Sequence, residues 1–291
     1  MTGHAASRPE LRLGFVLLFA PIGLWLALLI LLPHVELLLV SLREKVAPRV
    51  YEIGPGNYLE FFFEPLYWNT FVRTAVYSTL ATLLTLVIAF PVAYYIAKIL
   101  RGRLKNLLFL LCLLPFWVSE LVRALGWIIL LRETGVVSRT LQALGVIDQP
   151  VELLYNDAAM LTGLVYTSML FMVVPLVTSL DTLDDSLIEA GYDLGGNGFV
   201  VLREIVIPHA MPGIVSGCIV VFMLTLGNYV TPTLLGGKNS LWFTEQIYNQ
   251  FILRFNWEQG AAFGFLLLLL SSLIVWAGLR LSRQTLGQVV S

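Results

Sequence analysis

The sequence is poor in charged residues, in cysteine and in histidine. Only 13% of its 291 residues are charged, against about 25% in a soluble globular domain, while 58% are hydrophobic. The two cysteines, Cys112 and Cys218, lie within apolar runs and the three histidines are scattered, which excludes a disulfide framework and a cysteine/histidine metal site. The net charge of -1 provides no basic excess for nucleic acid. Water is therefore not the main solvent of this chain.

Apolar segments long enough to cross a bilayer recur along the whole chain. The mean hydropathy is +0.83, and each segment reaches the length of about 20 residues that spans a hydrocarbon core. Six transmembrane helices are predicted, at residues 13–33, 72–97, 107–131, 158–179, 212–231 and 261–281. No stretch between them could build a separate soluble core. We therefore expect an all-α, polytopic membrane protein with a single domain over residues 1–291.

The first apolar segment, residues 13–33, could also be read as a cleaved signal peptide. Such a peptide has an apolar core of about 7 to 15 residues that ends in a small-residue cleavage site. The segment is longer than this, and no such site follows it. We therefore expect a retained transmembrane helix.

The short segment of residues 98–105 sets the expected orientation. Four of its eight residues are cationic, namely Lys98, Arg101, Arg103 and Lys105. Short cationic loops remain on the cytoplasmic side of the membrane. With six spans, both termini are then cytoplasmic as well.

The segment after the fourth span has the pattern of a helix-turn-helix. Residues 184–186 (Asp-Asp-Ser) can cap a first helix, which the pair Gly195-Gly196 would end. Asn197 can cap a second helix, whose apolar residues recur at helical spacing until Pro208. A short helix held at both ends by membrane spans can convert movement of a docked soluble partner into movement of those spans.

This segment also carries a motif that resembles the E-A-A loop of binding-protein-dependent ABC importer permeases. The matching positions are Glu189-Ala190-Gly191, then Gly195, then Ile205-Val206-Ile207-Pro208. Two positions depart from the pattern: Gly191 replaces the second Ala, which weakens a helix by about 1 kcal/mol, and Ile207 replaces Leu. In that family the short helix of the loop sits in a groove of the ATPase subunit. The resemblance implies an ATPase-coupling site made of Glu189, Ala190, Gly191, Asp193, Gly195, Ile205 and Pro208.

The resemblance covers nearly the whole chain and is strongest to the PotB-type permeases of spermidine/putrescine importers. Phrases that carry it include Leu114-Pro115-Phe116-Trp117, Gly163-Leu164-Val165-Tyr166 and Pro208-His209-Ala210-Met211-Pro212-Gly213. It implies a type I ABC importer permease fold in the bacterial inner membrane, with a core region over about residues 70–281. The solute that it implies is a polyamine, although relatives of this shape also serve opines, amino acid derivatives and metal ions.

The resemblance also implies partners. These are a second permease subunit, expected to be a different, PotC-like chain, together with two cytoplasmic ATPase subunits, an external solute-binding protein and membrane lipid. The chain itself has no phosphate-binding loop, because residues 236–239 (Gly-Gly-Lys-Asn) lack the leading Gly and the Ser/Thr after Lys. ATP would therefore bind to the separate ATPase, so we expect no cofactor on this chain and no enzymatic activity.

The third span contains two ionisable residues at membrane depth, Glu120 and Arg123. Charge in hydrocarbon is costly, so such residues are functional candidates. Trp117 lies on the Glu120 face of a continuous helix and Trp127 lies one turn beyond Arg123. A carboxylate beside an indole suits a polyamine, through charge pairing and cation-π contact. Alternatively, Glu120 and Arg123, as i and i+3 neighbours, neutralise each other and serve only helix packing.

The fifth span contributes further polar candidates near its outer end. These are Thr225, Asn228, Tyr229 and Thr231. They could line the translocation route. They could equally form hydrogen bonds between helices.

Two other classes of protein fit a polytopic chain less well. A secondary transporter or channel more often has internal inverted repeats and several buried carboxylates, whereas this sequence has no visible repeat and only Glu120 at clear depth. An intramembrane enzyme would need a catalytic constellation within the spans, and none is present.

Overall fold

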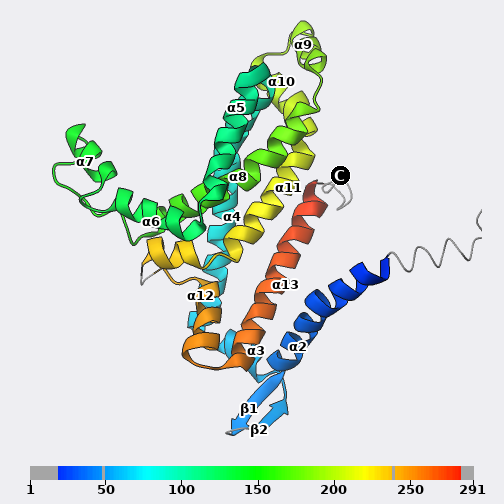
Figure 1. Ribbon diagram of the computed structural model, residues 1–291, viewed down its shortest axis with the longest axis vertical. Coiled ribbons are helices and arrows are strands. Elements are labelled where there is room, and N and C mark those ends of the chain that lie inside the picture. The colour runs from blue at the N-terminus through cyan, green and yellow to red at the C-terminus, as the bar shows by residue number, and fades with distance from the viewer. Residues whose placement is uncertain (1–18, 48–49, 238–239, 283–291) are drawn as a thin grey trace, which may run out of the picture. The chain divides into compact units, whose positions relative to one another are not determined.

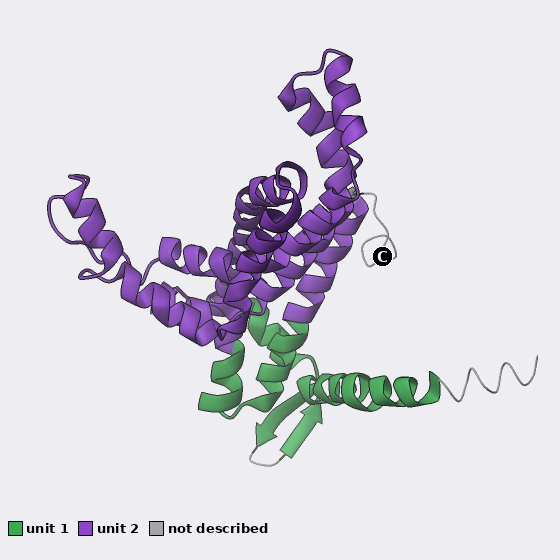
Figure 2. Cartoon of the chain, turned by 45° about the horizontal axis from the view of Figure 1, so that its top comes forward, with its two compact units in different colours: residues 1–64, 247–266 green, residues 65–246, 267–291 purple. Residues whose placement is uncertain are grey.

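The structure is a computed structural model that describes residues 19–47, 50–237 and 240–282, most of them in helices (Figure 1). The described residues form two compact units, which Figure 2 distinguishes by colour. Unit 1 holds the described residues up to Glu64 together with Ile247–Leu266. Unit 2 holds Pro65–Gln246 and the described residues from Leu267 onward.

Within the described residues, five helices are long and apolar enough to cross a membrane. They are Phe19–Ser41, Pro65–Ile99, Asp157–Asp181, Gly198–Leu226 and Trp257–Arg280. A bent pair of shorter helices, Gly102–Trp117 and Glu120–Ala143, meets the same criterion when both are counted as one span. With that pair, the prediction of six spans is confirmed by length and composition.

Unit 2 contains most of the described helices. In chain order these are α4 (Pro65–Tyr94), a π turn η2 (Tyr95–Ile99), α5 (Gly102–Leu113), a 3-10 turn η3 (Leu114–Trp117), α6 (Glu120–Leu131), α7 (Val136–Ala143), α8 (Asp157–Asp181), α9 (Asp185–Asp193), α10 (Gly198–Val201), a π turn η4 (Leu202–Val206), α11 (Ile207–Leu226) and a π turn η5 (Pro232–Gly236). Two further helices, α12 (Phe243–Tyr248) and α13 (Trp257–Ser282), contain residues of both units.

Helix α8 packs against both α4 and α11 and forms the centre of unit 2 (Figure 1). Its side chains Met172, Leu176 and Leu180 are fully buried. The backbones of α8 and α11 approach closely, because a Cβ on Gly213 would lie only 2.6 Å from the carbonyl oxygen of Pro175. Small residues at a helix contact are typical of membrane bundles, where association depends on close packing.

The buried face of α4 is lined by small hydroxyl side chains. They are Thr70, Thr74, Ser78, Thr82 and Thr85. The threonine hydroxyls donate to carbonyl oxygens one turn earlier, as from Thr74 to Thr70 at 2.8 Å, so their polar groups are satisfied within the helix. Large apolar side chains such as Val87 point outward, which suits a helix whose outer solvent is lipid.

The third predicted span, residues 107–131, is not one continuous helix, and that prediction was wrong. Its two parts meet at a bend of 95°. Pro115 lies in the 3-10 turn and has no N–H to extend the helical ladder. After the extended residue Val118, the helix starts again at Glu120 because the Ser119 hydroxyl accepts a hydrogen bond from the Val122 N–H at 3.4 Å.

Unit 1 contains the described first span, Phe19–Ser41, and a small β-hairpin. The span includes a π turn η1 (Ala27–Leu31) and α2 (Leu32–Ser41), so it continues past the predicted end at residue 33, while the predicted start at residue 13 lies outside the described residues. After it come β1 (Arg43–Ala47), β2 (Val50–Ile53), α3 (Gly56–Phe63) and, later, a π turn η6 (Asn249–Leu253). The two strands are antiparallel, with Lys45 opposite Tyr51. Within the described residues this hairpin is the one departure from an all-α fold.

The close contact between α8 and α11 leads to a stability prediction. Gly213→Ala places a methyl group against the Pro175 carbonyl and should destabilise the protein by about 1 to 3 kcal/mol. Thermal unfolding of the purified protein in detergent measures the effect. The matched control is Gly264→Ala, whose Cβ would meet nothing within 4 Å. Equal unfolding temperatures for the two variants would contradict the proposed packing.

Candidate functional site

The helix-turn-helix predicted after the fourth span is confirmed as α9 and α10. Asp184 caps α9, since its Oδ1 accepts a hydrogen bond from the Ser186 N–H at 3.0 Å. This hydrogen bond lowers the pKa of the Asp184 carboxyl below its usual value, and the positive charge of Lys98 lowers the pKa further by a smaller amount. Asn197 caps α10 in the same way, with a 2.9 Å bond from the Val200 N–H. We call residues 184–208 the elbow.

The turn between the two helices depends on glycine. Gly195 has a φ of +85°, a left-handed conformation that costs a residue with a Cβ about 1 kcal/mol or more. The Gly196 N–H then donates to the Gly191 carbonyl at 3.0 Å and closes the end of α9. The predicted role of the glycine pair in ending the helix is therefore confirmed.

The second helix of the elbow does not end at Pro208, and that prediction was wrong. Helical structure is continuous from Gly198 through the π turn η4 and α11 to Leu226. The Ile207 N–H donates to the Leu202 carbonyl across the wide turn directly before Pro208. A wide turn at this point relieves the clash between a proline ring and the preceding helical turn.

The elbow is held together by contact between Gly191 and Ile205. A Cβ on Gly191 would lie 2.6 Å from Cδ1 of Ile205 and 3.2 Å from Cγ2 of Val201. Gly191 therefore leaves room for the isoleucine side chain, which accounts for one departure from the E-A-A pattern. The predicted coupling residues Gly191 and Ile205 face each other within the elbow.

The other predicted coupling residues are exposed. They are Glu189, Ala190, Asp193, Gly195 and Pro208. The elbow also exposes large apolar side chains, namely Leu187, Tyr192, Leu194 and Phe199. Exposed apolar groups of this size on a polar segment are typical of a surface that binds another protein. Coupling to an ATPase stays a prediction for this surface.

A second candidate site is a cavity of about 240 Å³ at the start of α6. It is lined by Phe116, Val118, Ser119, Glu120, Arg123, Thr167, Ser168, Phe171, Leu224 and Asn228. The cavity lies beside the break between α5 and α6, and its charged lining residues are Glu120 and Arg123. Of the predicted pathway residues, the structure brings Glu120, Arg123 and Asn228 together here.

Glu120 and Arg123 do not pair with each other. Glu120 Oε1 accepts hydrogen bonds from the Asn228 amide and, at 3.0 Å, from the Thr231 hydroxyl. Arg123 donates from Nη1 to the Thr167 carbonyl at 3.3 Å, and its buried Nε has no hydrogen-bond partner among the described residues. The alternative interpretation, in which the two residues neutralise each other, is therefore wrong, because Glu120 contacts the segment after α11 and Arg123 contacts α8.

The expectation that Trp117 and Glu120 share a helical face is also wrong. The helix is interrupted between them, and the Trp117 side chain is 84% exposed. Trp117 lines a separate apolar cavity of about 480 Å³, together with Phe116 and Phe171. Trp127 lies apart from both cavities and stacks edge-to-face on Tyr166, with ring centroids 5.5 Å apart.

The polar candidates of the fifth span occupy different environments. Helix α11 ends at Leu226, so Asn228 and Tyr229 follow the helix instead of lying inside it. The buried hydroxyl of Thr225 donates to the Val221 and Phe222 carbonyls of its own helix. Thr225 and Tyr229 do not line the Glu120 cavity. Their place in a translocation route stays a prediction.

A polar cluster that the sequence did not reveal joins the start of α8 to α4. Arg73 and Tyr77 of α4 both donate to the Asp157 carboxylate, and the Arg73 guanidinium lies 4.9 Å from the centre of the Tyr77 ring. Arg73 also donates to the Ser240 hydroxyl at 3.3 Å. The cluster ties three segments that are distant in sequence, and no periodicity or spacing could have predicted it.

Comparison with known proteins places this architecture in a family. The sequence pattern of the family described as binding-protein-dependent transport system inner membrane component matches residues 81–286. The chain belongs to this family. The spermidine/putrescine transport system permease protein PotB of Haemophilus influenzae is 32% identical over 89% of this chain and 91% of that protein. PotB of Escherichia coli is 33% identical over 89% of this chain and 94% of that protein.

Two more distant similarities are also to transport proteins. The molybdenum transport system permease protein ModB of Azotobacter vinelandii is 25% identical over 55% of this chain and 69% of that protein. The crystal structure of a bacterial alginate ABC transporter in complex with alginate pentasaccharide-bound periplasmic protein matches with a TM-score of 0.78. That match covers 94% of this chain and 96% of the other at 17% identity, so it shows the fold alone.

Family membership decides between the classes left open by the sequence. The chain is an inner membrane permease component of a binding-protein-dependent ABC transport system, with the ABC importer permease fold. It is a transport protein and not an intramembrane enzyme, a secondary transporter or a channel. Its family implies a solute-binding protein and an ATPase as partners.

The glycine turn of the elbow leads to a second prediction. Gly195→Ala should loosen the end of α9 by about 1 kcal/mol, because alanine disfavours the left-handed conformation. Amide hydrogen exchange over α9 should then be faster than in the wild type. Gly198→Ala is the matched control, since its Cβ would make only an ordinary contact at 3.7 Å with the Tyr192 hydroxyl. Unchanged exchange in Gly195→Ala would contradict the assigned role of this turn.

Proposed function

We propose that this chain is the permease subunit of an ATP-driven polyamine importer in the bacterial inner membrane. The observation that carries the proposal is the identity of 32–33% to the PotB spermidine/putrescine permeases, over about nine tenths of the chain. The second permease subunit is then a different, PotC-like chain. The pair would enclose one translocation route.

The elbow faces the cytoplasm in this proposal. The cationic residues 98–105 support this orientation, since Lys98 and Lys105 lie directly against the start of the elbow and the end of α8. An even number of spans then places both termini in the cytoplasm. An external solute-binding protein would dock at the opposite ends of the spans.

Two ATPase subunits would dock on the elbows of the two permease chains. The exposed Leu187, Leu194 and Phe199 provide apolar contact area, and Glu189 and Asp193 provide charge around it. ATP would bind to the ATPase subunits, with no cofactor on this chain. When the ATPases close on ATP, the elbows move together and turn the route outward; hydrolysis reverses the change.

The Glu120 cavity is suited to an organic cation. Both hydrogen bonds to Glu120 use Oε1, and Oε2 has no hydrogen-bond partner among the described residues. Oε2 can therefore accept a hydrogen bond from a solute ammonium group. The rings of Phe116 and Phe171, whose centroids are 5.9 Å apart, line the same cavity and can contact the alkyl chain or the cation.

A second solute class is favoured by Arg123. Its guanidinium lines the cavity with Glu120, and within the described part of the chain its Nε has no hydrogen-bond partner. A solute with both an ammonium and a carboxylate, such as an opine or an amino acid derivative, would engage both residues. A polyamine would engage only the carboxylate.

The proposal is tested by uptake into proteoliposomes that contain the full complex of both permeases, the ATPase and the binding protein. Spermidine and putrescine should each stimulate ATP hydrolysis and accumulate inside, because the complex couples their import to the ATPase. Opines, amino acids and molybdate form the comparison set. Stimulation by one of these solutes, without any response to either polyamine, would contradict the polyamine assignment and leave the ABC permease assignment intact.

The role of the cavity is tested with Glu120→Gln. Glutamine keeps the volume and can accept the hydrogen bonds of Asn228 and Thr231, so a packing role predicts little change. A pathway role predicts that the maximal rate of polyamine uptake falls about ten-fold or more, since a hydrogen bond to a charged group is lost. Glu133→Gln is the control, because it makes the same charge change at an exposed glutamate that does not line the cavity. Wild-type uptake by Glu120→Gln would disprove the pathway role.

A further inference from the structure

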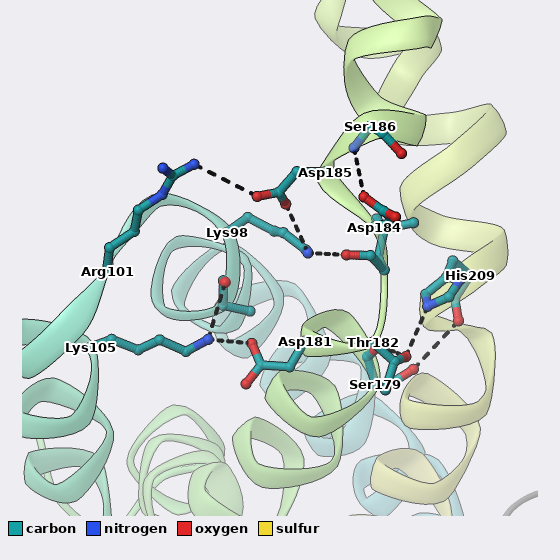
Figure 3. Close-up of polar contacts among 12 residues, drawn as sticks. Lys98, Arg101, Lys105, Ser179, Asp181, Thr182, Asp184, Asp185, Ser186 and His209 are labelled. Carbon is teal, nitrogen blue, oxygen red and sulfur yellow. Dashed lines mark hydrogen bonds and ion pairs between the residues drawn. The ribbon is translucent and has the colours of Figure 1, made fainter.

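Two lysines reach across unit 2 to the connector between α8 and α9. Lys105 in α5 pairs with Asp181, the last residue of α8, at 2.7 Å. Lys98 in the π turn η2 pairs with Asp185, the first residue of α9, at 3.1 Å. Lys98 also donates to the carbonyl of Leu183, between the two carboxylates. Figure 3 shows both lysines pointing at the connector from the same side.

The Lys98 contact differs from an ordinary surface ion pair. Its side chain is only 7% exposed, and a lysine is almost never buried unless its charge is paired. The connector is anchored at its centre as well, because Leu183 is buried in the main apolar core of unit 2. Solvent therefore screens this contact less than it screens an exposed pair.

The Lys105 contact opposes the preference of both helices. Asp181 is at the C-terminus of α8, where the helix dipole disfavours a negative charge. Lys105 is in the second turn of α5, near an N-terminus that disfavours a positive charge. Neither charge stabilises its own helix. Within the structure Lys105 is stabilised by Asp181 and, at 3.4 Å, by the carbonyl of Ala97.

These contacts give the elbow a second mechanical connection. The chain itself joins α9 to α8 and, through α10, to α11. Lys98, directly after α4, and Lys105, in α5, connect these two helices to the elbow as well. Helix α5 is followed by η3, which contains Phe116 of the Glu120 cavity. We propose that Lys98 and Lys105 are positioning residues, which form an ionic clamp that transmits movement of α9 to α5 and the cavity wall. The proposal depends on the proposed docking of an ATPase on the elbow.

The Lys105–Asp181 pair allows a double-mutant test in the reconstituted full complex. Lys105→Ala and Asp181→Ala should each lower the number of solute molecules imported per ATP about three-fold, and the double variant should be no worse than either. The exchanged pair, Lys105→Asp with Asp181→Lys, should recover most of the loss, because both charges then also suit their helix ends. The ATPase should co-purify with every variant.

Lys98 is tested with Lys98→Met, which retains the buried stem and removes the charge. It should lower the import per ATP to a similar extent. The matched control is Arg103→Ala in the same segment, since Arg103 is exposed and forms no ion pair with the described residues. This control should couple hydrolysis to import as the wild type does.

Three results would overturn the clamp. They are unchanged import per ATP in the single variants, a loss of the ATPase from the complex, and a failure of the exchanged pair to recover. A wild-type complex that hydrolyses ATP without importing any solute contradicts the proposed function instead. The clamp is then tested by amide hydrogen exchange of α5 with and without ATP. ATP should change the exchange rate in the wild type and not in Lys105→Ala. The same ATP-dependent change in Lys105→Ala would overturn the proposal.

Discussion

Hydrocarbon offers no hydrogen-bond partner to an interrupted helix, and the described spans are organised around this constraint. Four helices that follow a break start with a side-chain cap: Ser119 for α6, Asn156 for α8, Asp184 for α9 and Asn197 for α10. The π and 3-10 turns keep the backbone bonded where the helical path changes. Because the break before Glu120 is satisfied locally, the chain can bend at membrane depth and leave a cavity lined by polar groups.

The same break connects the two candidate sites. Helix α5 has 12 residues and is therefore about 18 Å long. Lys105 near its start contacts the end of α8, and Phe116, three residues after its end, lines the cavity. A rigid helix between two such contacts moves as one body, so displacement at the elbow changes the cavity wall without any change inside α5. If residues 107–131 formed a single straight helix, α5 would not end at the wall of the cavity.

The sequence predicts what depends on local order and misses what depends on contacts between helices. Hydropathy located the six spans, and the capping residues and glycines located the elbow, because each signal lies within one segment. Pro115 was a visible signal for the bend, but a proline in a membrane helix is often accommodated, so the sequence alone did not separate a kink from a break. The Arg73–Asp157 cluster depends on the position of α8, which no local pattern contains. The hydroxyl face of α4, in contrast, recurs at helical spacing and was a visible signal in the sequence.

The ion pairs, too, depend on contacts between helices and not on local sequence, and the resulting arrangement of charges affects how a solute is selected. The pairs Arg73–Asp157, Lys98–Asp185 and Lys105–Asp181 join distant helices, whereas the sequence neighbours Glu120 and Arg123 turn apart. The cavity thus holds one carboxylate and one guanidinium, and its formal charges cancel. As the proposed solute site, such a cavity would orient a charged solute through individual contacts but would not concentrate polycations by net attraction. In a binding-protein-dependent importer this is sufficient, because capture and most of the selectivity can reside in the external protein, while the permease must let the solute leave.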